Sequence, residues 1–199
     1  MHNEVLDQHN ISCRSSQHPI RAFPRTTGRV HQEGDFMYKN ILLPTDGLGK
    51  CAYGTCHGVI LAKALNAKIT AVHITGKLSA KEILEMYHPE VLFAPSDVRK
   101  AKEAMAHAEK SHKELASKAL NVAENMCREV GVPCEQVHIS GESPTDGIMK
   151  VAKEKKCDLI FISTHGNPGI MGTLFGTIAT KVMAQSKIPV LVHYCGGPS

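Results

Sequence analysis

Strand-length apolar runs that alternate with helix-like segments constrain this chain more than any other feature. The runs lie at 38–43, 67–74, 134–139, 158–162 and 189–193. The segments between them carry apolar residues at helical spacing. Crossovers between parallel strands are right-handed and place helices on both faces of a sheet. We therefore expect an α/β fold with a doubly wound five-stranded parallel sheet. The strand order expected for this sheet is 3-2-1-4-5.

Four helices are expected between these strands. The first has an apolar face formed by Cys56, Val59, Ile60 and Ala64. A long helix is predicted to begin after a cap at Ser96 or Asp97 and to end at Gly131, and shorter helices are predicted at 144–155 and 177–185.

The long helix carries a stripe at three-four spacing, which predicts a face buried against the sheet. A coiled coil is the alternative, but the Ala and His positions give a zipper little volume. The stripe consists of Val98, Ala101, Met105, Ala108, His112, Leu115, Ala119, Val122 and Met126.

The chain is predicted to have one folded domain, at 38–199. Residues 1–37 show no sustained period and end in Met37, so we interpret them as a disordered extension or an over-extended start. A targeting or partner-binding arm is the alternative, because Arg residues are scattered through this segment. Acidic residues among them, Glu4 and Asp7 for example, argue against an organelle signal.

Composition disfavours nucleic acid and membrane as partners. The net charge is +4, the basic residues are interspersed with acids, Trp is absent and aromatic residues make up 5%. No apolar run approaches the roughly 20 residues that cross a bilayer, and the first residues lack a leader pattern. We expect a cytoplasmic protein.

Ligands of doubly wound sheets bind outside the carboxyl ends of the strands, where the strand order reverses. In this order that place lies between the strands 38–43 and 158–162. The loop from Pro44 to Gly49 follows the first of these strands. The segment 163–177, which contains four glycines and opens a helix, follows the second. Glycines and a helix N-terminus together can bind phosphate, although a glycine-rich surface turn is the alternative.

Five segments resemble the universal stress protein family. They appear in order and with compatible spacing, and the resemblance spans 38–194. It implies a Rossmann-like fold of the adenine nucleotide alpha hydrolase-like type and, in the branch that binds nucleotide, ATP, with or without Mg²⁺. The segments are Ile-Leu-Leu-Pro-Thr-Asp-Gly at 41–47, Ala-Val-His-Ile at 71–74, Ser-Gly-Glu-Ser-Pro at 140–144, Ser-Thr-His-Gly at 163–166 and Lys-Ile-Pro-Val-Leu-Val-His at 187–193.

ATP-binding members carry Gly-x2-Gly-x9-Gly-Ser/Thr after the fourth strand. This chain has Ser163, Gly166, Gly176 and Thr177, so the first glycine is replaced. A serine Cβ restricts φ and adds bulk where the backbone approaches the nucleotide, and Pro168 removes one N–H donor. By the resemblance, Gly166, Gly176 and Thr177 hold phosphates. Thr177 also suits a helix N-cap.

The resemblance implies further nucleotide contacts. In the family the aspartate that follows the first strand meets the nucleotide, which assigns Asp46 to ribose, adenine or water-bound Mg²⁺. An Asx turn is the alternative role of Asp46. The adenine slot would be lined by Pro44, Thr45 and Ile74 with Ile162 beside it, although Ile74 and Ile162 also suit core packing. The full set of expected contacts is Pro44, Thr45, Asp46, Ile74, Ile162, Ser163, Gly166, Gly176, Thr177 and Ile178.

These residues favour an ATP-binding regulatory protein of the stress response over a turnover enzyme. A hydrolase triad of Asp46, Ser163 and His165 is disfavoured because a Gly-x-Ser-x-Gly elbow is absent. A slow ATPase is disfavoured because the sequence has no Walker lysine. The apolar strand 189–193 is expected at a sheet edge, where pairing with a second copy would form a homodimer. The alternatives are a non-nucleotide adaptor of the same fold and a slow ATPase.

Overall fold

The computed structural model describes residues 38–46, 51–77, 98–164 and 176–195, and for 51–52 and 98–101 it describes the backbone alone. The predictions for 1–37, for the caps Ser96 and Asp97, and for His165, Gly166 and Pro168 lie outside these residues.

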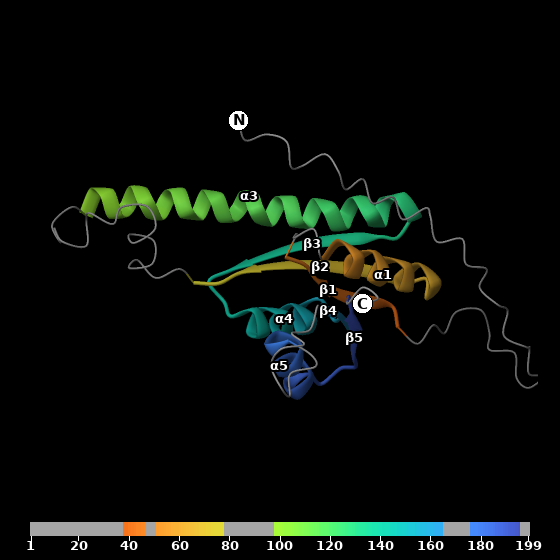
Figure 1. Ribbon diagram of the computed structural model, residues 1–199. Coiled ribbons are helices and arrows are strands. Elements are labelled where there is room, and N and C mark those ends of the chain that lie inside the picture. The colour runs from red at the N-terminus through yellow and green to blue at the C-terminus, as the bar shows by residue number, and fades with distance from the viewer. Residues whose placement is uncertain (1–37, 47–50, 78–97, 165–175, 196–199) are drawn as a thin grey trace, which may run out of the picture.

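The strands form one parallel sheet in the order β3-β2-β1-β4-β5 (Figure 1). This confirms the predicted topology, and the predicted strands agree with the observed ones to within two residues. Parallel strands need crossovers, so all five carboxyl ends lie along one edge of the sheet. The strands are β1 (Asn40–Pro44), β2 (Lys68–Thr75), β3 (Cys134–Ser140), β4 (Leu159–Thr164) and β5 (Val190–Tyr194).

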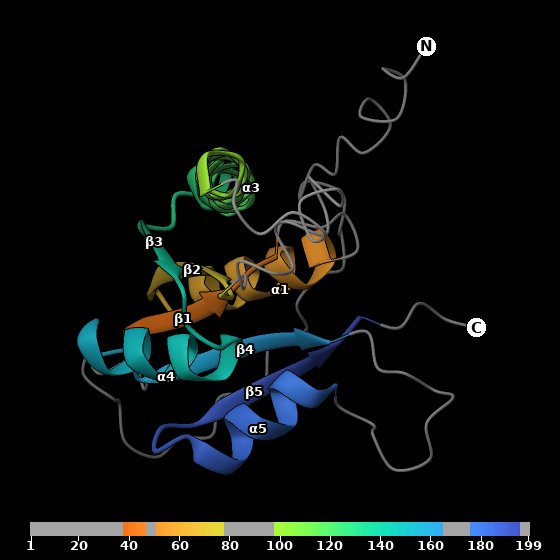
Figure 2. The ribbon, with the colours of Figure 1, turned by 90° about the vertical axis from the view of Figure 1, so that its left-hand side faces the viewer.

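Helices cover both faces of the sheet (Figure 2). Helices α1 (Cys51–Ala64) and α3 (Val98–Val130) lie on one face, and α4 (Pro144–Glu154) and α5 (Thr177–Gln185) lie on the other. In the described part of the chain no helix is both long and apolar enough to span a membrane.

The central strand β1 divides the core into two clusters. Ile41 and Leu43 pack with α1 and α3, whereas Leu42 packs with α4 and α5. All three side chains are completely buried. Successive side chains of a strand point to opposite faces, so an uninterrupted apolar run is what a strand covered on both faces requires.

A buried asparagine anchors the start of β1. The Asn40 side-chain Nδ2 donates to the carbonyl oxygen of Lys155 at 2.9 Å, and its Oδ1 accepts from the Thr70 hydroxyl at 2.9 Å. The Asp158 carboxylate accepts the backbone N–H groups of Lys39 at 2.8 Å and Asn40 at 3.0 Å. One side chain and one carboxylate thereby tie β1 to β2 and to the turn before β4.

The predicted stripe on α3 is partly wrong. Ala108, Ala119 and Met126 are buried, but Met105, Leu115 and Val122 are 40%, 57% and 38% exposed. The predicted stripe repeats every seven residues, and a straight helix with 3.6 residues per turn rotates by about 20° per heptad relative to such a repeat. The face that meets the sheet therefore shifts to other positions, which include Ala104, Ala116, Leu120, Ala123 and Cys127.

Replacing Asn40 by Leu should lower the free energy of unfolding by about 2–3 kcal/mol. Leu has a similar size, but it leaves the buried Thr70 hydroxyl without its acceptor and the Lys155 carbonyl without its donor. Urea unfolding would measure the change. Asn125→Leu, on the exposed face of α3, is the matched control and should change stability by no more than about 0.5 kcal/mol. Equal effects of the two substitutions would contradict the anchoring role.

Candidate functional site

The strands β1 and β4 stop pairing before their carboxyl ends. Leu42 opposite Ile160 is their last register pair within the described residues, whereas β1 remains paired with β2 as far as Pro44 opposite Val72. The connections from these two strands run in opposite directions along the sheet, as the strand order shows. This switch point between β1 and β4 is where the sequence predicted a ligand site.

On the β1 side, neighbouring groups of β2 hold the predicted residues. The Thr45 backbone N–H donates to the carbonyl oxygen of Val72 at 2.9 Å. The Thr45 carbonyl oxygen lies 2.8 Å from His73 Nδ1 and accepts a hydrogen bond from it. Pro44 and Thr45 are half-buried and Asp46 is exposed, so the chain passes from the held strand end to the surface at Asp46.

The role of His73 was not recognised in the sequence. It lies in β2, is only 9% exposed, and its Nδ1–H donates to the carbonyl oxygen of Thr45. The available signal was a histidine inside an otherwise apolar strand. Sequence alone does not show that its partner is a backbone carbonyl 28 positions away.

On the β4 side, Ser163 fits against helix α1. A Cβ built on Gly54 would lie 2.2 Å from the Ser163 Cβ and 2.5 Å from its Oγ, so a side chain at 54 is incompatible with this arrangement. Gly54 thus provides the space that the Ser163 side chain occupies. Among the described non-glycine residues only Asn66 and Lys156 have positive φ, so the backbone at Ser163 does not require glycine.

The next residue of β4 faces the opposite side of the sheet, toward helix α5. A Cβ on Gly176 would lie 3.3 Å from the Thr164 Oγ1. Gly176, rather than Thr177, is the N-cap residue of α5 and has no side chain that could cap the helix, and Thr177 and Ile178 are exposed. Backbone N–H groups in the first turn of such a helix can bind an anion.

The two predicted isoleucines belong to the core. Ile162 is 4% exposed and lies in the cluster with α4 and α5, and half-buried Ile74 packs against the same cluster. A Cβ on Gly147 of α4 would lie 2.9 Å from the Ile74 Cγ1, so α4 approaches β2 closely there. The structure therefore brings Pro44, Thr45, Asp46, Ser163, Gly176 and Thr177 to the carboxyl edge of the sheet, and places Ile74 and Ile162 beneath them.

The described residues contain no group of three or more His, Cys, Asp or Glu side chains that could hold a metal ion.

The sequence profile of the Universal stress protein family matches residues 37–193. The chain belongs to the universal stress protein family. A universal stress protein of Methanocaldococcus jannaschii is 27% identical over 163 residues, which cover 82% of this chain and 86% of the relative.

Solved structures of the family share the fold. A universal stress protein in complex with cAMP matches with a TM-score of 0.52 and 19% identity. The match covers 80% of this chain and 98% of the solved chain. The universal stress protein from Archaeoglobus fulgidus in complex with dAMP matches with a TM-score of 0.50 and 18% identity. This match covers 78% of this chain and 97% of the solved chain. At these identities the likeness concerns the fold.

The Gly54–Ser163 contact predicts a strong coupling between the two positions. Gly54→Ala should lower the free energy of unfolding by about 1–3 kcal/mol, because the new methyl group overlaps Ser163. In a Ser163→Gly background the loss should be at least about 1 kcal/mol smaller. A double-mutant cycle by urea unfolding measures this. Gly76→Ala, where an added Cβ meets no atom within 4 Å, is the control. Strictly additive effects would contradict the contact.

Proposed function

We propose that this universal stress protein binds adenine nucleotide, ATP in the first place, at the switch point between β1 and β4, and acts as a regulatory protein in a stress response. One observation carries the proposal. The strands part after Leu42 and Ile160, and Asp46 and the N-terminus of α5 lie along the same edge. A carboxylate for hydroxyl groups and backbone N–H groups for phosphate are the complementary halves of a nucleotide site.

The chain's residues fit this ligand. The N-cap residue Gly176 contributes no side-chain cap to α5, and the space beside Gly54 accommodates the Ser163 side chain. In the proposed site the Asp46 carboxylate accepts hydrogen bonds from ribose hydroxyls. The backbone N–H groups of Gly176, Thr177 and Ile178 bind the phosphates.

Pro44 and Thr45 border the adenine slot, with Ile74 and Ile162 forming its apolar floor. Gly166 belongs to the same proposed set and lies outside the described residues. Bound ATP would bring the phosphate charges, and Mg²⁺ accompanying it would be coordinated by phosphate oxygens and water.

The relatives support an adenine nucleotide as the ligand class. Structures of universal stress proteins contain cAMP in one case and dAMP in another. Both ligands combine an adenine base with a phosphate, the two groups for which the switch point offers complementary partners.

The proposed activity is regulation by occupancy rather than turnover. A non-nucleotide adaptor and a slow ATPase are the alternatives, and one experiment separates them. The purified protein is denatured and any released nucleotide identified, and fresh protein is then incubated with Mg-ATP while product is followed. Absence of both bound nucleotide and an ATP-dependent thermal shift favours the adaptor, and multiple turnovers favour the enzyme.

Asp46→Ala should weaken ATP binding by about tenfold, because it removes an acceptor for the ribose hydroxyls. The variant should keep its melting temperature, since the Asp46 side chain is exposed. Isothermal titration calorimetry measures the affinity. Glu129→Ala, which removes an exposed acid on α3, is the control for the change in net charge. An unchanged affinity in Asp46→Ala would remove Asp46 from the site.

We also propose a homodimer formed through 189–193 at the β5 edge. Strand β5 pairs only with β4 in the described sheet, so its outer edge presents unpaired backbone groups, and Leu191 and Tyr194 are 38% and 52% exposed. Pairing with a second copy would satisfy these groups.

Leu191→Lys should shift the protein toward monomer in sedimentation velocity at micromolar concentration, because it places a charge in the proposed interface. Val122→Lys is a matched control, since Val122 on α3 is also 38% exposed. A wild-type protein that sediments as a monomer would contradict the proposal, and so would equal effects of the two substitutions.

A further inference from the structure

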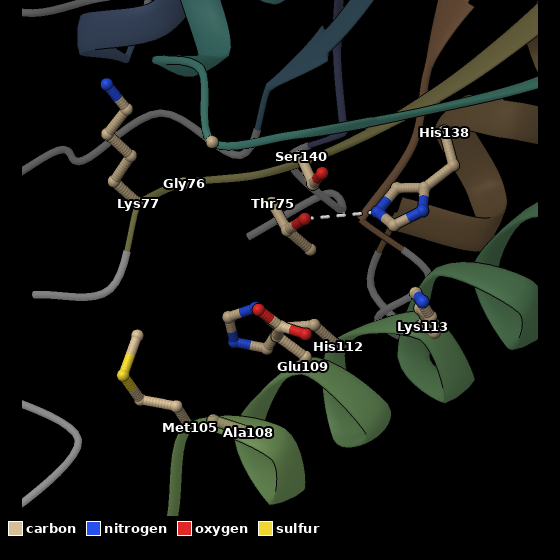
Figure 3. Close-up of a pocket in the computed structure, with 11 residues that line it drawn as sticks. Thr75, Gly76, Lys77, Met105, Ala108, Glu109, His112, Lys113, His138 and Ser140 are labelled. Atoms are coloured by element: carbon tan, nitrogen blue, oxygen red, sulfur yellow. Dashed lines mark hydrogen bonds between the residues drawn. The ribbon is translucent and has the colours of Figure 1, made fainter. Parts of the chain in front are cut away.

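A cavity lies between the carboxyl ends of β2 and β3 and helix α3, away from the switch point between β1 and β4 (Figure 3). Its volume is about 370 Å³, within the range of small-molecule sites. None of its lining residues belongs to the set predicted for the nucleotide. The lining consists of Thr75, Gly76, Lys77, Met105, Ala108, Glu109, His112, Lys113, His138, Ser140 and Gly141.

Basic groups predominate in this cavity. Lys113 contributes an ammonium group and His112 and His138 contribute imidazoles, whereas Glu109 is the single acid of the lining. Lys77 also belongs to the lining, but its side chain extends away from these groups in Figure 3. Burial lowers the pKa of His138, and the positive potential of His73, His112 and Lys113 lowers it further. The cavity therefore disfavours an additional positive charge and would be stabilised by a negative one.

The polar groups converge from two sides. In Figure 3, His112 and Glu109 extend from α3 toward the strand ends, where Thr75 and Ser140 face them. The Thr75 Oγ1 lies 3.0 Å from His138 Nε2, and the same hydroxyl donates to the carbonyl oxygen of Ile139 at 3.4 Å. Because the hydroxyl proton is directed to that carbonyl, Oγ1 is placed to accept from His138 Nε2–H. This contact holds the ring of His138 beside the cavity.

We propose that this cavity binds a small organic anion, a carboxylate or a phosphate monoester, between the imidazoles of His112 and His138 and the ammonium of Lys113. Thr75 and Ser140 offer hydroxyl groups for the polar substituents of the ligand. Met105 and Ala108 provide an apolar wall for its carbon skeleton.

Two other ligand classes fit less well. A directly coordinated metal ion would need a cluster of ligating side chains, and no group of three or more is found among the described residues. A neutral ligand would leave the excess of basic groups without compensation. The proposal is independent of the proposed nucleotide site, because it uses other residues on the other side of β2.

Histidine NMR on the full chain provides a test with residue-level readout. Glycerol phosphate and succinate serve as anionic probes and glycerol as the neutral control, each up to about 10 mM, which reaches weak millimolar binding. An anionic probe should shift the ring signals of His112 and His138 and raise the pKa of His138, because the anion favours the protonated ring. The two probes distinguish a phosphate ligand from a carboxylate.

His193 is an internal control for this measurement. Burial and the stacked His57, at a ring-centroid distance of 4.3 Å, lower the pKa of His193, but it does not line the cavity. Its signals should stay unchanged. The proposal would be overturned if the ring signals of His112 and His138 did not shift with an anionic probe, or if all three rings shifted equally. An equal shift with glycerol would also overturn it.

Charge substitutions give effects of opposite sign. His112→Gln should weaken binding of the anionic probe by about tenfold and Lys113→Gln by about fivefold, whereas Glu109→Gln should strengthen it by about threefold. Lys110→Gln, a neighbouring exposed lysine outside the lining, should have no effect. Weaker binding in Glu109→Gln, or equal losses in the two lysine variants, would contradict the assignment.

Affinity for succinate should be higher at about pH 6.5 than at about pH 8. Glycerol phosphate is not used for this comparison, because its phosphate itself takes up a proton near pH 6. In the free protein the pKa of His138 is lowered, so binding near neutral pH takes up a proton. An affinity that rises with pH would overturn the proposal. The basic groups that act on His138 are His73 from β2 and His112 and Lys113 from α3, and the charged groups Lys77 and Glu109 also line the cavity.

Discussion

The structure depends on the hydrogen bonds of Asn40 at the start of the central strand. Its side chain joins β1 to Thr70 in β2 and to the Lys155 carbonyl before β4, and Asp158 holds its backbone N–H. These contacts fix β1 along its axis between its two neighbours. With β1 in place, the completely buried Ile41, Leu42 and Leu43 define the two halves of the core, and the carboxyl ends of the strands come to one edge.

The close approach of α1 to the sheet determines how the β4 end tolerates Ser163. Gly54 lacks a side chain where Ser163 needs room, and at Gly58 an added Cβ would lie 2.8 Å from the Leu43 Cδ1. A helix with larger residues at these two positions would have to stand farther from β1 and β4. The serine is therefore accommodated by the glycine at position 54 of α1, and Ser163 itself has no special backbone conformation.

Strand β2 separates the two candidate ligand sites. On the β1 side, His73 donates to the carbonyl oxygen of Thr45. In the register of β2 and β3, His73 lies opposite His138, which borders the cavity beside α3. The two ring centroids are 6.1 Å apart. The end of β2 thus holds Thr45, which precedes Asp46, on one side. On its other side, together with the end of β3, it borders a cavity rich in basic groups.

The sequence by itself determined the strands and the doubly wound sheet, because apolar periodicity and crossover handedness act over short stretches of chain. The family followed from the resemblance of five segments, and the edge at which Asp46 and Thr177 lie followed from the expected strand order. The sequence misplaced part of the buried face of α3, since a seven-residue repeat does not follow the 3.6-residue turn. Only the tertiary structure decided that Gly54 makes room for Ser163, that His73 holds Thr45, and that His112 and His138 share a cavity. Each of these contacts joins different secondary-structure elements, and its geometry depends on how closely they pack, which no local pattern encodes.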